Sequence, residues 1–104
     1  MFAEEHKTQV KLNQVTLDRD EAMQFCFILD GSETCPMIED VLFVYFDSGV
    51  LTLRPNCCFD DAITYRYRFD EAISLYYALK NRKYTQVTLV CHPWGVDVET
   101  FHED

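Results

Sequence analysis

The residues best suited to chemistry in this chain are its cysteines and the one histidine that lies away from both termini. Cys57 and Cys58 are adjacent, and Cys91 is followed directly by His92. Zinc sites built from pairs of ligands usually separate the two by about two to four residues, so that both can face one ion. Adjacent residues on a strand point to opposite faces. The spacing therefore argues against a metal site, and we expect buried, inert thiols.

His92 is the candidate general base. In that role it needs an orienting carboxylate and a nucleophile nearby. The sequence offers Asp60 and Asp61 as candidate carboxylates, but no feature of it favours them. A histidine at the shoulder of a hairpin is more often a polar turn residue. The three glycines are all used by turns or a helix end, which leaves no glycine-rich phosphate loop. We therefore predict a protein without catalysis or cofactor. The glycines are Gly31, Gly49 and Gly95.

The composition limits the classes of partner. The chain has 104 residues, enough for a single domain spanning residues 1–104, and 48% of them are hydrophobic. Nine basic against eighteen acidic residues give a formal net charge of −9. Such a chain repels polyphosphate and anionic lipid, so we expect neither a nucleic acid nor a membrane as partner. A cationic or neutral partner, including a basic protein, fits better.

The cysteine count and the N-terminal stretch indicate a compartment. Five cysteines are an odd number, and "MFAEEHKTQV" carries charges where a secretory signal has an apolar run. No apolar stretch reaches the length that spans a bilayer. These features predict free thiols in the cytoplasm.

The first half of the chain reads as a strand, a helix and a hairpin. Alternation over residues 6–17 predicts a strand with a bulge at Asn13-Gln14. Asp18 and Glu21 are spaced as a capping box, and Gly31 is placed to end the helix that follows. Residues 41–54 predict a hairpin that turns through 47–49.

The second half repeats that order. Residues 62–69 predict a strand, followed by a helix that Asp70 caps and that reaches about Lys83. A second hairpin, over 87–98, turns through 93–95. The strand contains the run "YRYRF", in which aromatic and arginine residues alternate. Because alternation places the two kinds of side chain on opposite faces, the run favours a half-buried strand over a base-stacking surface.

The predicted fold is α+β: a single domain with a mainly antiparallel sheet of about six strands and two helices, packed on one side or on opposite ends. Two stretches, 8–54 and 62–101, share the β-α-β-β order, and "DEA" occurs at residues 20–22 and again at 70–72. A tandem pseudo-repeat is one interpretation. The other is coincidence, since the matching residues are those that helices and hairpins favour.

The leading functional hypothesis is a non-catalytic, acidic interaction protein that acts through protein surfaces and forms a homodimer. Residues 41–46 are six consecutive apolar residues, so the strand needs cover on both faces. We expect the homodimer interface on the hairpin, at Val41, Phe43, Tyr45, Leu51 and Leu53.

The alternative hypothesis is a small-molecule binding protein whose aromatic pocket takes apolar or cationic ligands by cation–π contact. Trp94 is the sole tryptophan and falls at a predicted turn. It either forms an exposed binding residue or folds back onto its own sheet. The residues expected to line this pocket are Tyr65, Tyr67, Tyr76, Tyr77 and Trp94.

Overall fold

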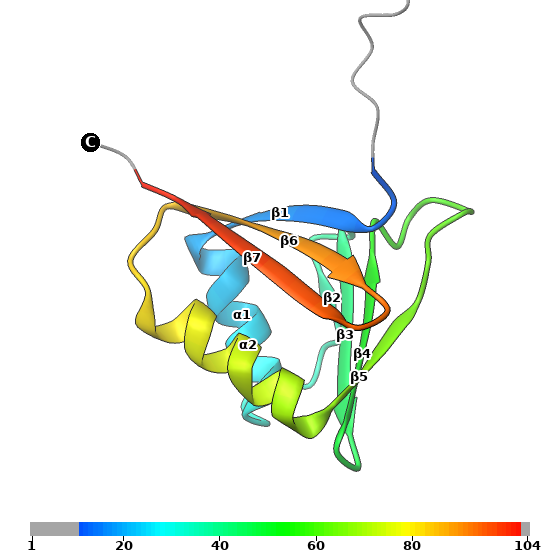
Figure 1. Cartoon of the computed structure of the whole chain (residues 1–104), viewed down its shortest axis with the longest axis horizontal. Coiled ribbons are helices and arrows are strands. Elements are labelled where there is room, and N and C mark those ends of the chain that lie inside the picture. Colours follow the sequence, from blue (N-terminus) through cyan, green and yellow to red (C-terminus); the bar gives the residue numbers. More distant parts are fainter. Residues whose placement is uncertain (1–10, 103–104) are drawn as a thin grey trace, which may run out of the picture.

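The computed structural model describes residues 11–102, and within this range it contains seven strands and two helices (Figure 1). The α+β class and the antiparallel pairing predicted from the sequence are confirmed. The elements are β1 (Gln14–Asp18), α1 (Arg19–Leu29), β2 (Met37–Ile38), β3 (Leu42–Asp47), β4 (Val50–Pro55), β5 (Tyr65–Arg68), α2 (Phe69–Asn81), β6 (Gln86–His92) and β7 (Gly95–Phe101).

The strands divide between two sheets. Sheet A has the order β1-β6-β7 and sheet B the order β2-β3-β4-β5, with every neighbouring pair antiparallel. Each half of the chain thus gives its first strand to the hairpin of the other half. The exchange is not symmetric. β1 pairs with β6, the first strand of the β6–β7 hairpin, whereas β5 pairs with β4, the second strand of the β3–β4 hairpin. A duplication of 8–54 and 62–101 stays a prediction.

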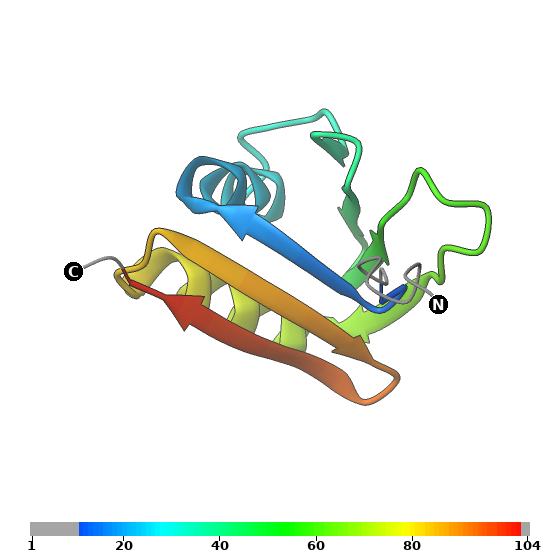
Figure 2. The ribbon, with the colours of Figure 1, turned by 90° about the horizontal axis from the view of Figure 1, so that it is seen from above.

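Both helices lie in the angle between the two sheets, and the core fills that angle (Figures 1 and 2). Each sheet therefore covers the helices with one face and leaves its other face outward. Leucines from both sheets and from α2, together with Phe25 of α1, are fully buried between them. The most buried large side chains are Leu17, Phe25, Ile38, Leu42, Leu51, Leu53, Leu75, Leu79 and Leu89.

The helix α1 forms as its local sequence predicts. Asp18 accepts a hydrogen bond from the backbone N–H of Glu21, and the Glu21 carboxylate accepts one from the N–H of Asp18. This reciprocal pair satisfies two N–H groups that the helix itself cannot use. Gly31 has a positive φ of 86° after the last turn, which is the left-handed conformation that ends many helices.

The helix α2 begins earlier than predicted. Its N-cap is Arg68, which makes no side-chain capping bond, and Phe69 already occupies the first helical position. The Asp70 carboxylate accepts a hydrogen bond from the N–H of Glu71 inside the first turn. Asp70 therefore favours the helix N-terminus by its charge rather than as its cap, which corrects the sequence-based expectation.

Both predicted hairpins are present, but the first has a different register. Asp47 pairs with Val50, so the loop of the β3–β4 hairpin holds only Ser48 and Gly49. Their φ angles, 55° and 80°, are those of a type I′ turn, which matches the twist of the flanking strands. The β6–β7 hairpin has an equally short loop of Pro93 and Trp94, because His92 pairs with Gly95.

The start of β1 also differs from the prediction. Leu12 and Asn13 form a turn, and the strand begins at Gln14, while residues 6–10 of the predicted strand lie outside the described range. The Asn13 side-chain amide donates to the carbonyl of Cys91, and the Asn13 carbonyl accepts from the Cys91 N–H. These bonds extend the β1–β6 pairing by one residue without regular strand geometry, at the place where a bulge was expected. Among residues 11–102, neither helix has the length and apolarity needed to span a bilayer.

Candidate functional site

His92 is held by two contacts at the end of β6. Its Nε2 lies 3.1 Å from Oδ2 of Asp97, and its ring stacks on Trp94 with the ring centroids 4.6 Å apart. The carboxylate beside the histidine is therefore Asp97, not Asp60 or Asp61. The neighbouring thiol, Cys91, is buried on the other face of the strand, and burial raises its pKa to about 11. Histidine and thiol do not converge, so this is no nucleophile–base pair.

The cysteines do not assemble into a ligand cluster. All five thiols are free, with Cys26 and Cys91 buried and Cys35 and Cys58 exposed. Burial likewise raises the pKa of Cys26 to about 11, which keeps this thiol protonated at neutral pH. Within residues 11–102, no three side chains of His, Cys, Asp or Glu stand close enough together to hold a metal ion.

Trp94 projects from the β6–β7 turn and is 79% exposed. Together with Arg66, Arg68, Asp70 and Glu71 it borders an open hollow of about 370 Å³. Both signs of charge line this hollow, and Tyr67, Pro93 and Trp94 supply its apolar part. It has no enclosed apolar wall, so the tryptophan alone does not define a pocket.

The five aromatics expected in one pocket occupy separate places. Tyr67 is buried, stacks on Tyr65 and donates a hydrogen bond to the backbone carbonyl of His92. Tyr76 and Tyr77 lie on α2, facing α1, and line a different cavity from the one beside Trp94. The single pocket predicted from the sequence is therefore wrong, although one of its pairs does line a groove.

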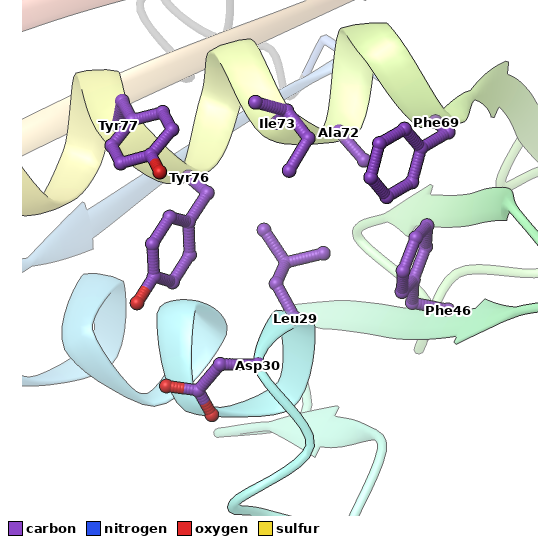
Figure 3. A pocket seen from close by; sticks show the side chains of 8 residues that line it. All are labelled: Leu29, Asp30, Phe46, Phe69, Ala72, Ile73, Tyr76 and Tyr77. Atoms are coloured by element: carbon purple, nitrogen blue, oxygen red, sulfur yellow. The ribbon is translucent and has the colours of Figure 1, made fainter.

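That groove lies between the two helices and the end of β3 (Figure 3). It has a volume of about 200 Å³ and a mostly apolar lining, with Asp30 at its rim. Phe46 and Phe69 stack across one end with their centroids 6.1 Å apart. Hydrogen bonds from Ser32 lower the pKa of Asp30, so the rim carries a negative charge at neutral pH. The lining residues are Leu29, Asp30, Phe46, Phe69, Ala72, Ile73, Tyr76 and Tyr77.

The groove opens onto an apolar row on α2 that nothing in the described chain covers. Phe69, Ile73 and Tyr77, which we call the α2 stripe, are 54%, 37% and 55% exposed. Their spacing of four residues places them one above another along one side of the helix. Lys80 continues the row: its Nζ lies 2.7 Å from the Tyr76 hydroxyl and 5.0 Å from the centre of that ring.

The outward face of sheet B differs from the interface predicted on the hairpin. Phe43 is half-buried and Tyr45 is exposed on this face. Leu51 and Leu53, however, are fully buried in the core, so these two residues of the predicted interface are wrong. Cross-strand pairing places Thr52 beside Tyr45 and Arg54 beside Phe43 instead. Val41, in the bend before β3, is half-buried against the core.

No family model, curated protein or solved structure matches this chain. Its function therefore has to be inferred from its own surfaces. The α2 stripe could have been found in the sequence, because the apolar residues at positions 69, 73 and 77 recur every four residues, which places them on one side of a helix. The groove could not, because Leu29 and Phe46 reach it only through the packing of α1 and β3.

Proposed function

We propose that this protein is a non-catalytic interaction protein that forms a homodimer through the α2 stripe. The observation that carries the proposal is the row of three large apolar side chains, Phe69, Ile73 and Tyr77, exposed beside an apolar groove. A contiguous apolar row exposed to water costs free energy and is typical of interaction sites. Burying it against a partner removes that cost.

The charges along α2 favour a second copy as the occupant. The helix carries Asp70 and Glu71 in its first turn, whereas Lys80 in its last turn is followed by Arg82 and Lys83. Two copies packed antiparallel bring the basic end of each helix near the acidic end of the other, and their helix dipoles also align favourably. The stripe itself carries no carboxylate, so a chain of net charge −9 can pair here without placing acid against acid.

The hairpin face is a weaker candidate for the dimer. Arg54, Arg66 and Arg68 project from that face of sheet B. A twofold interface brings identical patches together. It would set the arginines of one copy against those of the other, with a repulsion that the apolar row on α2 avoids.

Sedimentation equilibrium tests the dimer directly. We expect a dimer with a dissociation constant of about micromolar order, as suits a small apolar interface. Tyr77→Glu and Ile73→Glu should each give a monomer at the same concentration. Phe27→Glu is the matched control, because Phe27 is an exposed aromatic on α1 and lies outside both the stripe and the groove. A wild-type monomer, or equal effects of Tyr77→Glu and Phe27→Glu, would refute this interface.

A second candidate function uses the same groove for a small apolar or cationic ligand. The specific observation in its favour is that Tyr76 already holds a cation, the Lys80 ammonium, over its ring, with the Asp30 carboxylate at the rim. A thermal-shift screen with lipophilic quaternary ammonium compounds distinguishes the two. Stabilisation that Tyr76→Leu abolishes would support a ligand site, and a screen without stabilisation would leave the dimer. A basic protein that displaces the second copy would be a third outcome.

The thiols support a cytoplasmic location for this protein. All five are free, and two of them are buried without pairing. Free thiols persist in a reducing compartment. Fractionation of cells that express the full chain, followed by blotting, checks this assignment.

A further inference from the structure

The outward face of sheet B contains a hollow of about 350 Å³ that is basic in an acidic protein. Arg54 and Arg66 lie on its walls, and no aspartate or glutamate among residues 11–102 lines it. Thr52 and Thr64 add hydroxyl groups that can donate to an anion. We call it the arginine hollow, and its lining is Met37, Phe43, Thr52, Arg54, Cys57, Thr64 and Arg66.

The arginines of this hollow make no ion pair with a described carboxylate, although Arg66 also borders the Trp94 hollow that Asp70 and Glu71 line. Among residues 11–102, the only ion pair within 4.0 Å is that of His92 and Asp97, so neither Arg54 nor Arg66 is neutralised by a described carboxylate. Arg54 is half-buried, and its Nε is shielded from solvent without any hydrogen-bond partner in the described chain. A partly dehydrated guanidinium without an anion beside it raises the free energy of the protein, and binding of an anion offsets that cost.

An aromatic surface lies beside these cations. Phe43 is the direct cross-strand neighbour of Arg54, and Thr52 lies between Tyr45 and Arg66 in the same way. The rings of Phe43 and Tyr45 stack on each other with centroids 6.5 Å apart and an angle of 24° between their planes. Cations and rings thus share one surface although they come from different strands. Along β5 alone, the arginines and tyrosines point to opposite faces.

We propose that the arginine hollow binds a small anionic ligand that combines a phosphate or carboxylate with a flat aromatic ring, as a nucleoside monophosphate does. The two guanidinium groups and the threonine hydroxyls hold the anion, and Phe43 packs against the ring. The volume is within the range of small-ligand sites. A polymer fits less well, because its many phosphates would meet the net charge of −9 beyond the hollow. The site lies away from the α2 stripe and is independent of the dimer.

Isothermal titration of the full chain with adenosine 5′-monophosphate tests the site. We expect saturable binding, with adenosine alone and inorganic phosphate alone each weaker by about tenfold or more. Arg66→Gln should weaken the binding of the nucleotide by about tenfold, because it removes a charged hydrogen-bond donor to the anion. Arg66 is exposed, so the substitution leaves the core intact. Arg82→Gln, at the other end of the molecule beyond α2, is the control with the same change in net charge. It should change the affinity by less than about twofold.

A site-specific readout accompanies the titration. The Arg54 Nε–H signal in a proton–nitrogen correlation spectrum should shift on addition of the nucleotide, since this donor has no hydrogen-bond partner among residues 11–102. Three results would overturn the proposal: equal effects of Arg66→Gln and Arg82→Gln, phosphate alone binding as tightly as the nucleotide, or no shift of the Arg54 signal at saturation. Oligouridylate binding more than about tenfold tighter than the mononucleotide would also overturn it, in favour of a polymer.

Discussion

The hydroxyl of Tyr67 donates a hydrogen bond of 2.8 Å to the backbone carbonyl oxygen of His92. Tyr67 belongs to β5, at the edge of sheet B, and His92 ends β6, in the middle strand of sheet A. The bond therefore joins the two sheets at a point where no strand pairing connects them. The tyrosine is buried, and burial raises the pKa of its hydroxyl far above the usual value, so the group remains a donor.

Tyr67→Phe should lower the free energy of unfolding by about 1 kcal/mol, because the change removes one buried donor and leaves the ring in place. Urea denaturation followed by circular dichroism measures the difference. Tyr45→Phe is the matched control: its hydroxyl is exposed, and it should change the stability by less than about 0.5 kcal/mol. Equal effects of the two substitutions would show that the bond between the sheets adds nothing.

The two helix N-termini give a second prediction. Asp18 caps α1 through its side chain, whereas Arg68 at the corresponding place before α2 makes no capping bond. Arg68→Asp should supply the missing acceptor and stabilise the protein by about 0.5–1 kcal/mol, and Asp18→Ala should destabilise it by about 1 kcal/mol. Thermal melts of both variants check whether Arg68→Asp raises the melting temperature and Asp18→Ala lowers it. Destabilisation by Arg68→Asp would mean that the arginine contributes a contact worth more than a cap.

Arg68 also illustrates which parts of the fold can be predicted from the sequence. The α1 helix was predictable because its cap, box and end are local: Asp18, Glu21 and Gly31 each act within a few residues. In α2 the same reasoning chose Asp70, which is the better capping residue by type. The structure starts that helix directly after β5 because the pairing of β5 with β4 fixes where the strand ends, and that pairing is not local.

The interface predicted on the hairpin is partly wrong because the pairing register of β3 and β4 differs by one residue from the predicted register. A loop of residues 47–49 would pair Tyr45 with Leu51 and put both on one face. The type I′ loop holds only Ser48 and Gly49, so Tyr45 pairs with Thr52 and Leu51 turns into the core. Because side chains alternate along a strand, one residue of register moves every side chain of the partner strand to the other face. The arginine hollow depends on this register and could not be foreseen without it.

Two buried thiols make the protein sensitive to alkaline pH. Burial raises the pKa of Cys91 from 9.0 to about 11, and Cys26 is raised to a similar value. Between about pH 9 and pH 11, each of these thiols is deprotonated in the unfolded chain but stays protonated in the folded chain. Each thiol therefore contributes stability that is fully present below about pH 9 and is lost as the pH rises toward about 11, by up to about 1.4 kcal/mol per pH unit.

Urea denaturation at several pH values between these limits measures that loss. Cys91→Ala should make the fall of unfolding free energy with pH shallower, whatever it does to the stability at neutral pH. Leu89→Ala, two residues away on the same strand and equally buried, is the control. It should lower the stability at every pH and leave the slope unchanged. An identical slope in wild type and Cys91→Ala would contradict burial as the cause.

The orientation of the proposed dimer can be tested by exchanging charges on α2. In an antiparallel pair centred near Ile73, Tyr77 of one copy faces Phe69 of the other, and Lys80 comes within about one helical turn of Asp70. Lys80→Glu and Asp70→Lys should each weaken the dimer, because each places like charges across the interface. The double variant should recover most of the affinity.

Sedimentation equilibrium gives the dimer dissociation constants of the wild type, the two single variants and the double variant. These four values form a double-mutant cycle, which isolates the free energy of coupling between Lys80 and Asp70. A coupling of about 0.5–1 kcal/mol is expected for a partly exposed pair, and it should shrink as salt is added. Because both residues lie on one helix, each substitution also changes the stability of its own monomer. Denaturation of each variant therefore checks that its monomer stays folded under the conditions of the association measurement. A dimer that forms through α2 in a parallel arrangement would show single-variant losses that the double variant does not repair.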